Sequence, residues 1–271
     1  MPTVHPLAVV DPSAQLADDV YVGPFCVVGP NVVIGSGTRL ISHACVVGNT
    51  VLGKNNVLHP GAVLGGPPQD LKWKGEPTGL EVGDNNVFRE GVTVNIGTVQ
   101  DAISRGVTRV GSNNLFMANS HVGHDCQIGN ACVIANNVMI AGHVHVGDRV
   151  IMNGGVGLHH FVTVGDFAYL AGFARIHFDV PPFVKVADDD VIKALNKLGL
   201  RRAGKSESDI QALEAAFRKL FVRRGVPMAE AIRSFHMENG LHPDVKRMVQ
   251  AVERRATVKN GRYLESLRTA K

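Results

Sequence analysis

The chain has 271 residues, of which 45% are hydrophobic and 19% are charged, so its composition predicts a folded protein and excludes a disordered one. Aromatic residues make up only 6% of the chain, whereas it has 30 glycines, which favours short strands and tight turns. No apolar run reaches the ~18–20 residues that span a bilayer, and no secretory signal is visible at the N-terminus. These features predict a cytoplasmic protein without a transmembrane segment.

The four cysteines are too few and too widely spaced for a disulfide scaffold or a C-x-x-C site; they are Cys26, Cys45, Cys126 and Cys132. We interpret them as reduced structural residues.

The net charge of +4 divides unevenly along the chain. Residues 1–186 carry 10 basic and 13 acidic side chains, a net of −3, whereas residues 187–271 carry 18 and 11, a net of +7. The two parts therefore differ in electrostatics and are expected to differ in architecture.

Aliphatic or other large apolar residues recur every six positions over most of the chain. The pattern runs from Val4 to Leu64, from Val82 to Val94 and from Val110 to Ile176, which makes 26 hexads. A period of six matches neither the 3.6 of an α-helix nor the 2 of a strand. It predicts a coil with three short faces and 18 residues per turn, in which the repeated residue points inward and glycines ease the corners.

The six-residue phase breaks at 65–81 and again at 100–109. The first break contains three prolines, the only tryptophan and several charges, so we expect it to leave the coil as a loop. The second is a shorter excursion of the same kind. Loops on a rigid scaffold often carry function.

After residue 186 the hexads give way to helical spacing. Ser206 and Asp209 resemble a helix start, and Gly225 ends the apolar pattern that follows. Two more helices are expected, from Pro227 to about residue 238 and from Pro243 to about residue 255. We therefore predict two domains, a β-helix over 1–186 and a small basic helical domain over 187–271.

Residues 18 apart in an unbroken coil lie one above another, and this rule gathers the histidines. One column contains His124, Gly142 and His160, and its neighbour contains Asp125, His143 and Phe161. His121 and His159 lie beside these columns. An imidazole can act as a general base, with Asp125 as a nearby carboxylate to orient it. The Gly142 N–H could face a developing oxyanion.

Three interpretations of this cluster compete on the residues alone. The first is acyl transfer, in which His124 deprotonates a substrate hydroxyl that attacks a thioester. The second is a zinc site, since hexapeptide-repeat carbonic anhydrases bind zinc through histidines at a trimer interface. The third is structural, in which the histidines make ordinary hydrogen bonds on the outer walls of an inactive scaffold.

Several motifs occur in a specific order along nearly the whole chain. They are His-Val-Gly-His-Asp-Cys at 121–126, Pro-Gln-Asp-Leu-Lys-Trp-Lys-Gly-Glu-Pro-Thr at 68–78, Ile-Ala-Gly-His-Val at 140–144, Asp-Val-Pro-Pro at 179–182 and Gly-Leu-Arg-Arg at 199–202. With the hexads, they resemble the acyl carrier protein–UDP-N-acetylglucosamine O-acyltransferases of lipid A biosynthesis, a family of hexapeptide acyltransferases. The resemblance implies a left-handed parallel β-helix and a homotrimer.

The resemblance also implies transfer of a 3-hydroxyacyl chain from acyl carrier protein to the glucosamine 3-hydroxyl of UDP-N-acetylglucosamine, without a metal or other cofactor. By motif position His124 is the general base, Asp125 orients it and Gly142 donates to the oxyanion. Gly172 matches the position that gauges acyl length. The residues that match substrate contacts are Gln69, Asp70, Lys72, His121, His143, His159, His160, Asn196 and Arg202.

Some positions depart from the family pattern. Asn95 stands where some relatives place a histidine, and His160 where many have glutamine. Residues 187–190, Lys197, Leu198 and Ala203 also differ, so a different sugar nucleotide stays open, as does the acyl chain length. A related N-acyltransferase is a further variant, although it usually carries an extra N-terminal domain, whereas this repeat begins at Val4.

The basic tail fits an acidic acyl carrier protein by complementary charge. A solvated helical face is the alternative. Nucleic acid is not an expected partner, because stacking aromatics and recognised motifs are absent.

Overall fold

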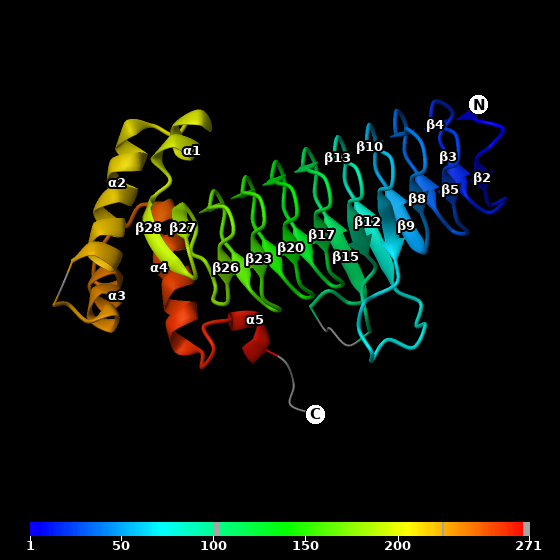
Figure 1. Ribbon diagram of the computed structural model, residues 1–271. Helices are drawn as coiled ribbons and strands as arrows, with labels where there is room; N and C mark the ends of the chain where they lie inside the picture. Colours follow the sequence, from blue (N-terminus) through cyan, green and yellow to red (C-terminus); the bar gives the residue numbers. More distant parts are fainter. Residues whose placement is uncertain (100–102, 224, 268–271) are drawn as a thin grey trace.

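The computed structural model describes residues 1–99, 103–223 and 225–267. The chain forms a long three-sided prism of stacked coils, with helices gathered at its C-terminal end (Figure 1). Three sheets make the sides of the prism, and every pairing among the strands of the coils is parallel.

The first sheet has eleven strands: β1 (Thr3–Val4), β4 (Tyr21–Val22), β7 (Arg39–Leu40), β10 (Val57–Leu58), β13 (Val87–Phe88), β16 (Leu115–Phe116), β19 (Val133–Ile134), β22 (Ile151–Met152), β25 (Tyr169–Leu170), β27 (Val184–Ala187) and β28 (Val191–Leu195). The second sheet has nine: β2 (Val9–Val10), β5 (Val27–Val28), β8 (Cys45–Val46), β11 (Val63–Gly66), β14 (Thr93–Asn95), β17 (His121–Val122), β20 (Met139–Ile140), β23 (Gly157–Leu158) and β26 (Arg175–Ile176). The third sheet has eight: β3 (Gln15–Leu16), β6 (Val33–Ile34), β9 (Asn49–Leu52), β12 (Gly79–Val82), β15 (Val107–Val110), β18 (Gln127–Ile128), β21 (His145–Val146) and β24 (Thr163–Val164).

The six-residue repeat maps directly onto these strands. Each of the first 26 strands contains one of the 26 predicted inward residues. In unbroken coils the paired residues are 18 apart, as in the series His121, Met139, Gly157. The inward row is buried from the second coil onward, and three of the four cysteines (Cys26, Cys126 and Cys132) are buried free thiols. The predicted coil geometry is therefore confirmed.

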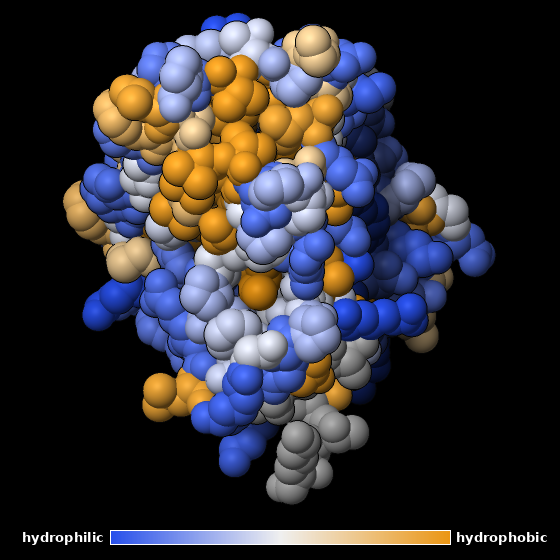
Figure 2. Space-filling view, turned by 90° about the vertical axis from the view of Figure 1, so that its right-hand side faces the viewer, coloured by the Kyte–Doolittle hydropathy of each residue, from blue (hydrophilic) through white to orange (hydrophobic). Residues whose placement is uncertain are grey.

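The two ends of the prism differ in how they are covered. In the first coil Val4 is 41% exposed, because no coil lies beneath it, whereas Val22 at the same position of the next coil is fully buried. Figure 2 views this end and shows hydrophobic surface gathered on it. At the other end the prism is closed by the β27–β28 hairpin, in which β27 continues the first sheet and pairs with β28 antiparallel.

Both breaks in the repeat leave the prism at the same corner, between the second and third sheets. The first lies between β11 and β12, and the second between β14 and β15. The second loop ends earlier than the expected 109, since Val107 to Arg109 already pair with Gly79 to Glu81. Residues 100–102 of that segment lie outside the described residues. The corner is also the one that carries His124, so the loops and the histidines share one side of the molecule.

The C-terminal part contains the three predicted helices and two that the sequence did not indicate. The capping box predicted at Ser206 is present, and it starts α2 (Glu207–Phe217), which continues as the π-helical turn η1 (Arg218–Val222). The other predicted helices are α3 (Met228–His236) and α4 (Pro243–Thr257). The additional ones are short: α1 (Lys197–Arg202) and α5 (Tyr263–Ser266). None of the helices in the described part of the chain is both long enough and apolar enough to cross a membrane.

A ladder of buried asparagines runs through one corner of the prism. Asn86 is fully buried, and both its backbone N–H and its side-chain amide donate to Asn56 Oδ1. The amide also donates to the Gly111 carbonyl, and Asn86 Oδ1 accepts from the Asn114 N–H at 2.9 Å. These side chains satisfy corner backbone groups that the sheets leave unpaired.

We predict that Asn86→Ala lowers the free energy of unfolding by about 2–4 kcal/mol, because it leaves the Asn114 N–H and the Gly111 carbonyl buried without partners. Urea unfolding at fixed protein concentration measures the change. Asn136→Ala is the matched control, since Asn136 is exposed, and it should change stability by less than about 0.5 kcal/mol. Equal stability of the two variants would show that the ladder contributes little.

Candidate active site

His124 and Asp125 lie at the corner that joins β17 to β18. Asp125 adopts the left-handed backbone conformation, with φ of 62°, which aspartate tolerates better than most residues. This turn lets two adjacent side chains meet, and His124 Nδ1 lies 2.8 Å from Asp125 Oδ2. The His124 side chain is 7% exposed and that of Asp125 is fully buried. The sequence left open whether these neighbours bond each other, and the structure shows that they do.

Within the described part of the chain, the Asp125 carboxylate accepts four hydrogen bonds. Oδ1 accepts from the Thr98 N–H at 2.8 Å and from the Ser104 hydroxyl at 2.6 Å. Oδ2 accepts from the Thr98 hydroxyl at 2.7 Å and faces the His124 ring nitrogen. Burial opposes the negative charge, but the hydrogen bonds from His124, Ser104 and Thr98 outweigh it and lower the pKa of the Asp125 carboxyl. Asp125 is therefore a carboxylate at neutral pH, and it holds His124 with Nε2 directed away from it.

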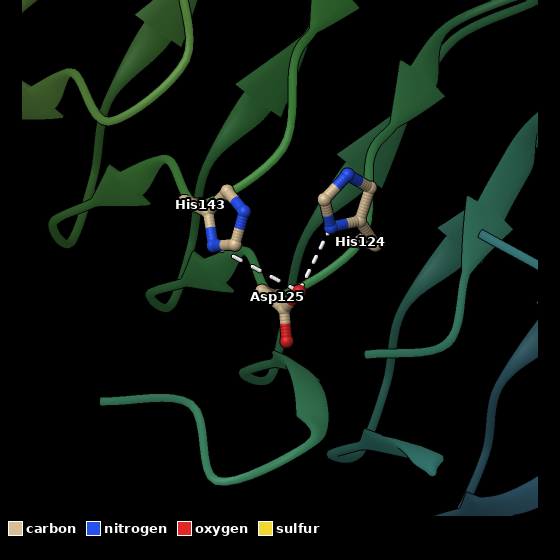
Figure 3. Close-up of side chains that lie close together, drawn as sticks. All are labelled: His124, Asp125 and His143. Atoms are coloured by element: carbon tan, nitrogen blue, oxygen red, sulfur yellow. Dashed lines mark hydrogen bonds and ion pairs between the residues drawn. The ribbon is translucent and has the colours of Figure 1, made fainter. Parts of the chain in front are cut away.

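The neighbouring coil places His143 against the same pair. The His143 N–H donates to the His124 carbonyl at 2.9 Å, and its ring meets that of His124 edge-on with centroids 4.8 Å apart. His143 Nδ1 lies 3.8 Å from Asp125 Oδ2, so the two histidines flank one carboxylate (Figure 3). Phe161 stacks on the other face of His143, as the predicted column requires.

Two further histidines near this pair have a lowered pKa. Burial, with the proximity of His124, lowers the pKa of His121, and the His121 ring lies 2.8 Å from the Thr93 hydroxyl. Burial, with His159, His124 and His143 nearby, lowers the pKa of His160. A lowered pKa favours the unprotonated imidazole, which can accept a hydrogen bond from a polar substrate.

Gly142 has a steric role that its column position implies. A Cβ atom at this residue would lie 2.6 Å from both Cε1 and Nε2 of His124. The imidazole therefore packs in the space that only glycine leaves. Among the described residues the Gly142 N–H has no acceptor, so it is available to a ligand.

A metal ion does not fit this arrangement as a resident group. One ligand atom each from His124, Asp125 and His143 lie within 4.8 Å of one another. However, the two Asp125 oxygens already accept four hydrogen bonds, and His124 Nδ1 is engaged with Oδ2. Metal ligation at these atoms would break a satisfied buried network.

Within the described chain the other predicted contact residues are not joined to the histidines. Gln69 and Lys72 are exposed in the first loop, where Asp70 accepts a hydrogen bond from the Lys72 N–H at 2.9 Å. No hydrogen bond or ion pair connects these three to the cluster in the part that the structure describes. His159 faces His160 and His177.

Asn196 and Arg202 lie at the start and end of α1, at the C-terminal end of the prism (Figure 1). Asn196 is buried and caps this helix, while its amide donates to the Phe167 carbonyl at 2.8 Å. A single chain therefore does not bring these residues to His124.

At Gly172 a Cβ would meet the Gly154 carbonyl oxygen at 3.4 Å, so a side chain there is sterically allowed.

Three functional hydroxyls were missed by the sequence analysis. Thr98 and Ser104 bind the Asp125 carboxylate, and the Thr108 hydroxyl accepts from the Asp125 N–H at 2.8 Å. The sequence feature that could have pointed to these hydroxyls is the second break in the repeat, because that loop leaves the coil directly below His124. A second histidine–carboxylate pair, His177 with Asp190 at 2.9 Å, was also missed, because it joins a coil to the β27–β28 hairpin.

Sequence comparisons assign this chain to a family. A family model described as UDP N-acetylglucosamine O-acyltransferase, domain 2, matches residues 179–260, and a model of bacterial transferase hexapeptide repeats matches 108–142. A relative from Anaeromyxobacter sp. (strain Fw109-5), named acyl-(acyl-carrier-protein)–UDP-N-acetylglucosamine O-acyltransferase, is 47% identical over 91% of this chain and 95% of its own length. The chain belongs to this O-acyltransferase family. A member from Xanthomonas euvesicatoria pv. vesicatoria (strain 85-10) is 44% identical over 93% of this chain and 95% of its own.

Solved structures of the family share the fold. The structure of LpxA from Acinetobacter baumannii is 39% identical, with a TM-score of 0.85 over 93% of this chain and 96% of that one. The UDP-N-acetylglucosamine acyltransferase of Francisella novicida is 37% identical, with a TM-score of 0.88 over 96% and 93%. The expected fold class, a left-handed parallel β-helix of hexapeptide repeats followed by a small helical part, is confirmed.

We predict that Gly142→Ala reduces acyl transfer at least tenfold while leaving the protein folded, because the new methyl group displaces the His124 ring. The control is Gly157→Ala, since a Cβ at Gly157 meets nothing within 4 Å and should leave the rate within about twofold. Turnover and circular dichroism of both variants measure the effect. Normal turnover in Gly142→Ala would contradict the packing of the imidazole on this glycine.

Proposed function

We propose that this chain is the O-acyltransferase that moves a 3-hydroxyacyl group from acyl carrier protein to the 3-hydroxyl of UDP-N-acetylglucosamine, the first step of lipid A biosynthesis. Family membership carries the reaction. The observation that carries the mechanism is the buried His124–Asp125 pair packed on Gly142.

His124 is the proposed general base. Asp125 accepts a hydrogen bond from the His124 Nδ1–H, which leaves Nε2 unprotonated and able to accept a proton from the sugar hydroxyl. As that proton moves to Nε2, the hydroxyl oxygen attacks the thioester carbonyl. Asp125 then stabilises the imidazolium that forms, without taking the proton itself.

The Gly142 N–H is the proposed donor to the carbonyl oxygen when that oxygen becomes negative. Collapse of the tetrahedral intermediate breaks the carbon–sulfur bond and forms the sugar ester. The departing thiolate of the carrier protein takes the proton from His124 Nε2, which restores the base. No metal or other cofactor enters these steps.

The remaining predicted residues form the proposed substrate pocket. Gln69, Asp70 and Lys72 in the first loop, with His121, His143, His159 and His160, would hold the sugar nucleotide. Since Asn196 and Arg202 lie far along the prism, we propose that they reach the pocket of a neighbouring copy in a homotrimer. The half-buried apolar side chains on the outer face of the first sheet support such an assembly: Val57, Val87, Leu115, Val133 and Ile151.

The donor is proposed to dock on the basic domain formed by residues 187–271, which carries a net charge of +7. Complementary charge would speed its encounter with an acidic carrier protein.

At Gly172 the absence of a side chain would leave the acyl groove open, so this residue is the proposed gauge of chain length.

The zinc-dependent alternative is not favoured, because the relatives are O-acyltransferases and the Asp125 oxygens are already saturated. The variant with another sugar nucleotide rests on the departures from the family pattern. Asn95 is one of them: it is buried, and its Oδ1 has no partner among the described residues.

We predict that the wild-type protein transfers acyl groups from 3-hydroxyacyl carrier proteins to UDP-N-acetylglucosamine and that His124→Ala lowers kcat by about 10²–10⁴-fold, the usual cost of losing a general base. A panel of donors with different chain lengths would give the preferred acyl group. An inactive wild type with this acceptor would contradict the assigned substrates. Full activity in a folded His124→Ala variant would contradict the assigned base.

A further inference from the structure

The Asp125 carboxylate receives more protein hydrogen bonds than orienting one imidazole requires. Its four close donors are the Thr98 N–H, the Thr98 hydroxyl, the Ser104 hydroxyl and His124 Nδ1. Three of them come from the chain between β14 and β15, where the second break in the repeat lies. Both Thr98 and Ser104 are fully buried, so these two residues direct their polar groups inward, onto the carboxylate.

The hydroxyl directions are themselves fixed. Ser104 Oγ accepts from the Gly106 N–H at 3.2 Å, which leaves its proton to point at Asp125. The Ser104 carbonyl accepts from Arg109 at 3.1 Å, and Arg109 is also paired with Glu81 on the adjacent strand. The Thr108 hydroxyl holds the Asp125 N–H at 2.8 Å. The loop is thereby tied to the third sheet at the level of the carboxylate.

Two imidazoles compete for the same oxygen. Asp125 Oδ2 lies 2.8 Å from His124 Nδ1 and 3.8 Å from His143 Nδ1. A modest rotation of the carboxylate would move its charge from one ring toward the other. The Thr98 and Ser104 hydroxyls bind the two different oxygens, and together they prevent that rotation.

We propose that Thr98 and Ser104 are positioning residues that lock the Asp125 carboxylate onto His124 and away from His143, and so decide which histidine is the base. The inference rests on the proposed function, in which His124 is that base. It gives the second loop a mechanistic role, since a regular hexad in its place would continue the wall of the prism and bring no hydroxyl to this carboxylate.

The inference predicts that the hydroxyls act only through Asp125. We expect Ser104→Ala and Thr98→Val each to lower kcat roughly 10- to 100-fold, the range for losing one hydrogen bond to a charged group. KM for the sugar nucleotide should change less than twofold. In an Asp125→Asn background the same changes should lower the rate less than twofold further, because residues acting as one unit are not additive. Single-turnover reactions at high enzyme concentration keep the slow variants measurable.

The pH dependence gives a second readout. The titratable groups that face the pair are His121, His143 and His160, and Asp125 is the one carboxylate beside His124 among the described residues. A loosened carboxylate stabilises a protonated His124 less, so the acidic limb of the kcat/KM profile should move to lower pH in Ser104→Ala. A general folding defect would lower the rate without moving this limb.

The control variants match the tests chemically. Ser120 is also fully buried, but its hydroxyl has no partner within the described residues, so Ser120→Ala should leave kcat within about twofold. Thr98→Ser keeps the hydroxyl and should restore most of the rate lost in Thr98→Val.

The outcomes separate this inference from the function on which it rests. Equal rate losses in the wild-type and Asp125→Asn backgrounds, or an unmoved acidic limb, would overturn the positioning role alone. Full activity of His124→Ala would instead overturn the assigned base. Both would be supported by three results together. The rate losses in Ser104→Ala and Thr98→Val would largely disappear in the Asp125→Asn background, the acidic limb of the kcat/KM profile would shift in Ser104→Ala, and Ser120→Ala would keep a normal rate.

Discussion

The parallel hydrogen bonding between successive coils is the interaction on which the rest of this structure depends. Successive coils exchange backbone hydrogen bonds: the His121 N–H donates to the Val138 carbonyl of the next coil at 2.9 Å, and the His143 N–H donates back to the His124 carbonyl of the preceding coil at 2.9 Å. Because the coils are bonded in strict 18-residue register, residues that are far apart in the sequence come to lie in vertical columns. The chemistry of the site follows from three such neighbours: His124, the glycine above it and the histidine beside that glycine. A side chain on that glycine or a slip in register would dismantle the arrangement without touching a reacting group.

The hydrogen bonds around Asp125 explain how the structure tolerates a fully buried negative charge next to the base. An unpaired carboxylate in this position would be protonated, because burial disfavours the charged form. Here the hydroxyls of a loop and the adjacent histidine supply the donors that water would otherwise provide, and the Asp125 pKa stays low. Burial and neighbouring histidines lower the pKa of His121 and of His160, while the Asp125 carboxylate beside His124 Nδ1 defines the direction of proton transfer.

The sequence predicted those parts of the structure that obey a period. The hexads located all 26 strands of the coils, and the 18-residue step alone predicted that His124, Gly142 and His143 lie together. It could not place Thr98 or Ser104, because they lie where the period breaks and no register relates them to Asp125. The β27–β28 hairpin was missed because antiparallel pairing follows a different rule, and α1 because six residues carry too little periodicity. Asn196 and Arg202 lie away from the histidines in one chain, so their proposed role depends on contacts between copies that neither period nor register describes.

The measurement that tests the central claim most directly is the protonation state of His124 in the free protein, observed by ¹⁵N NMR of histidine-labelled protein and assigned by comparison with His124→Ala. The account predicts a proton on Nδ1, hydrogen-bonded to Asp125, and an unprotonated Nε2 near neutral pH. In Asp125→Asn this preference should weaken or reverse. A proton found on Nε2 in the wild-type protein would contradict the account, since that nitrogen would then be unable to accept the proton of the attacking hydroxyl.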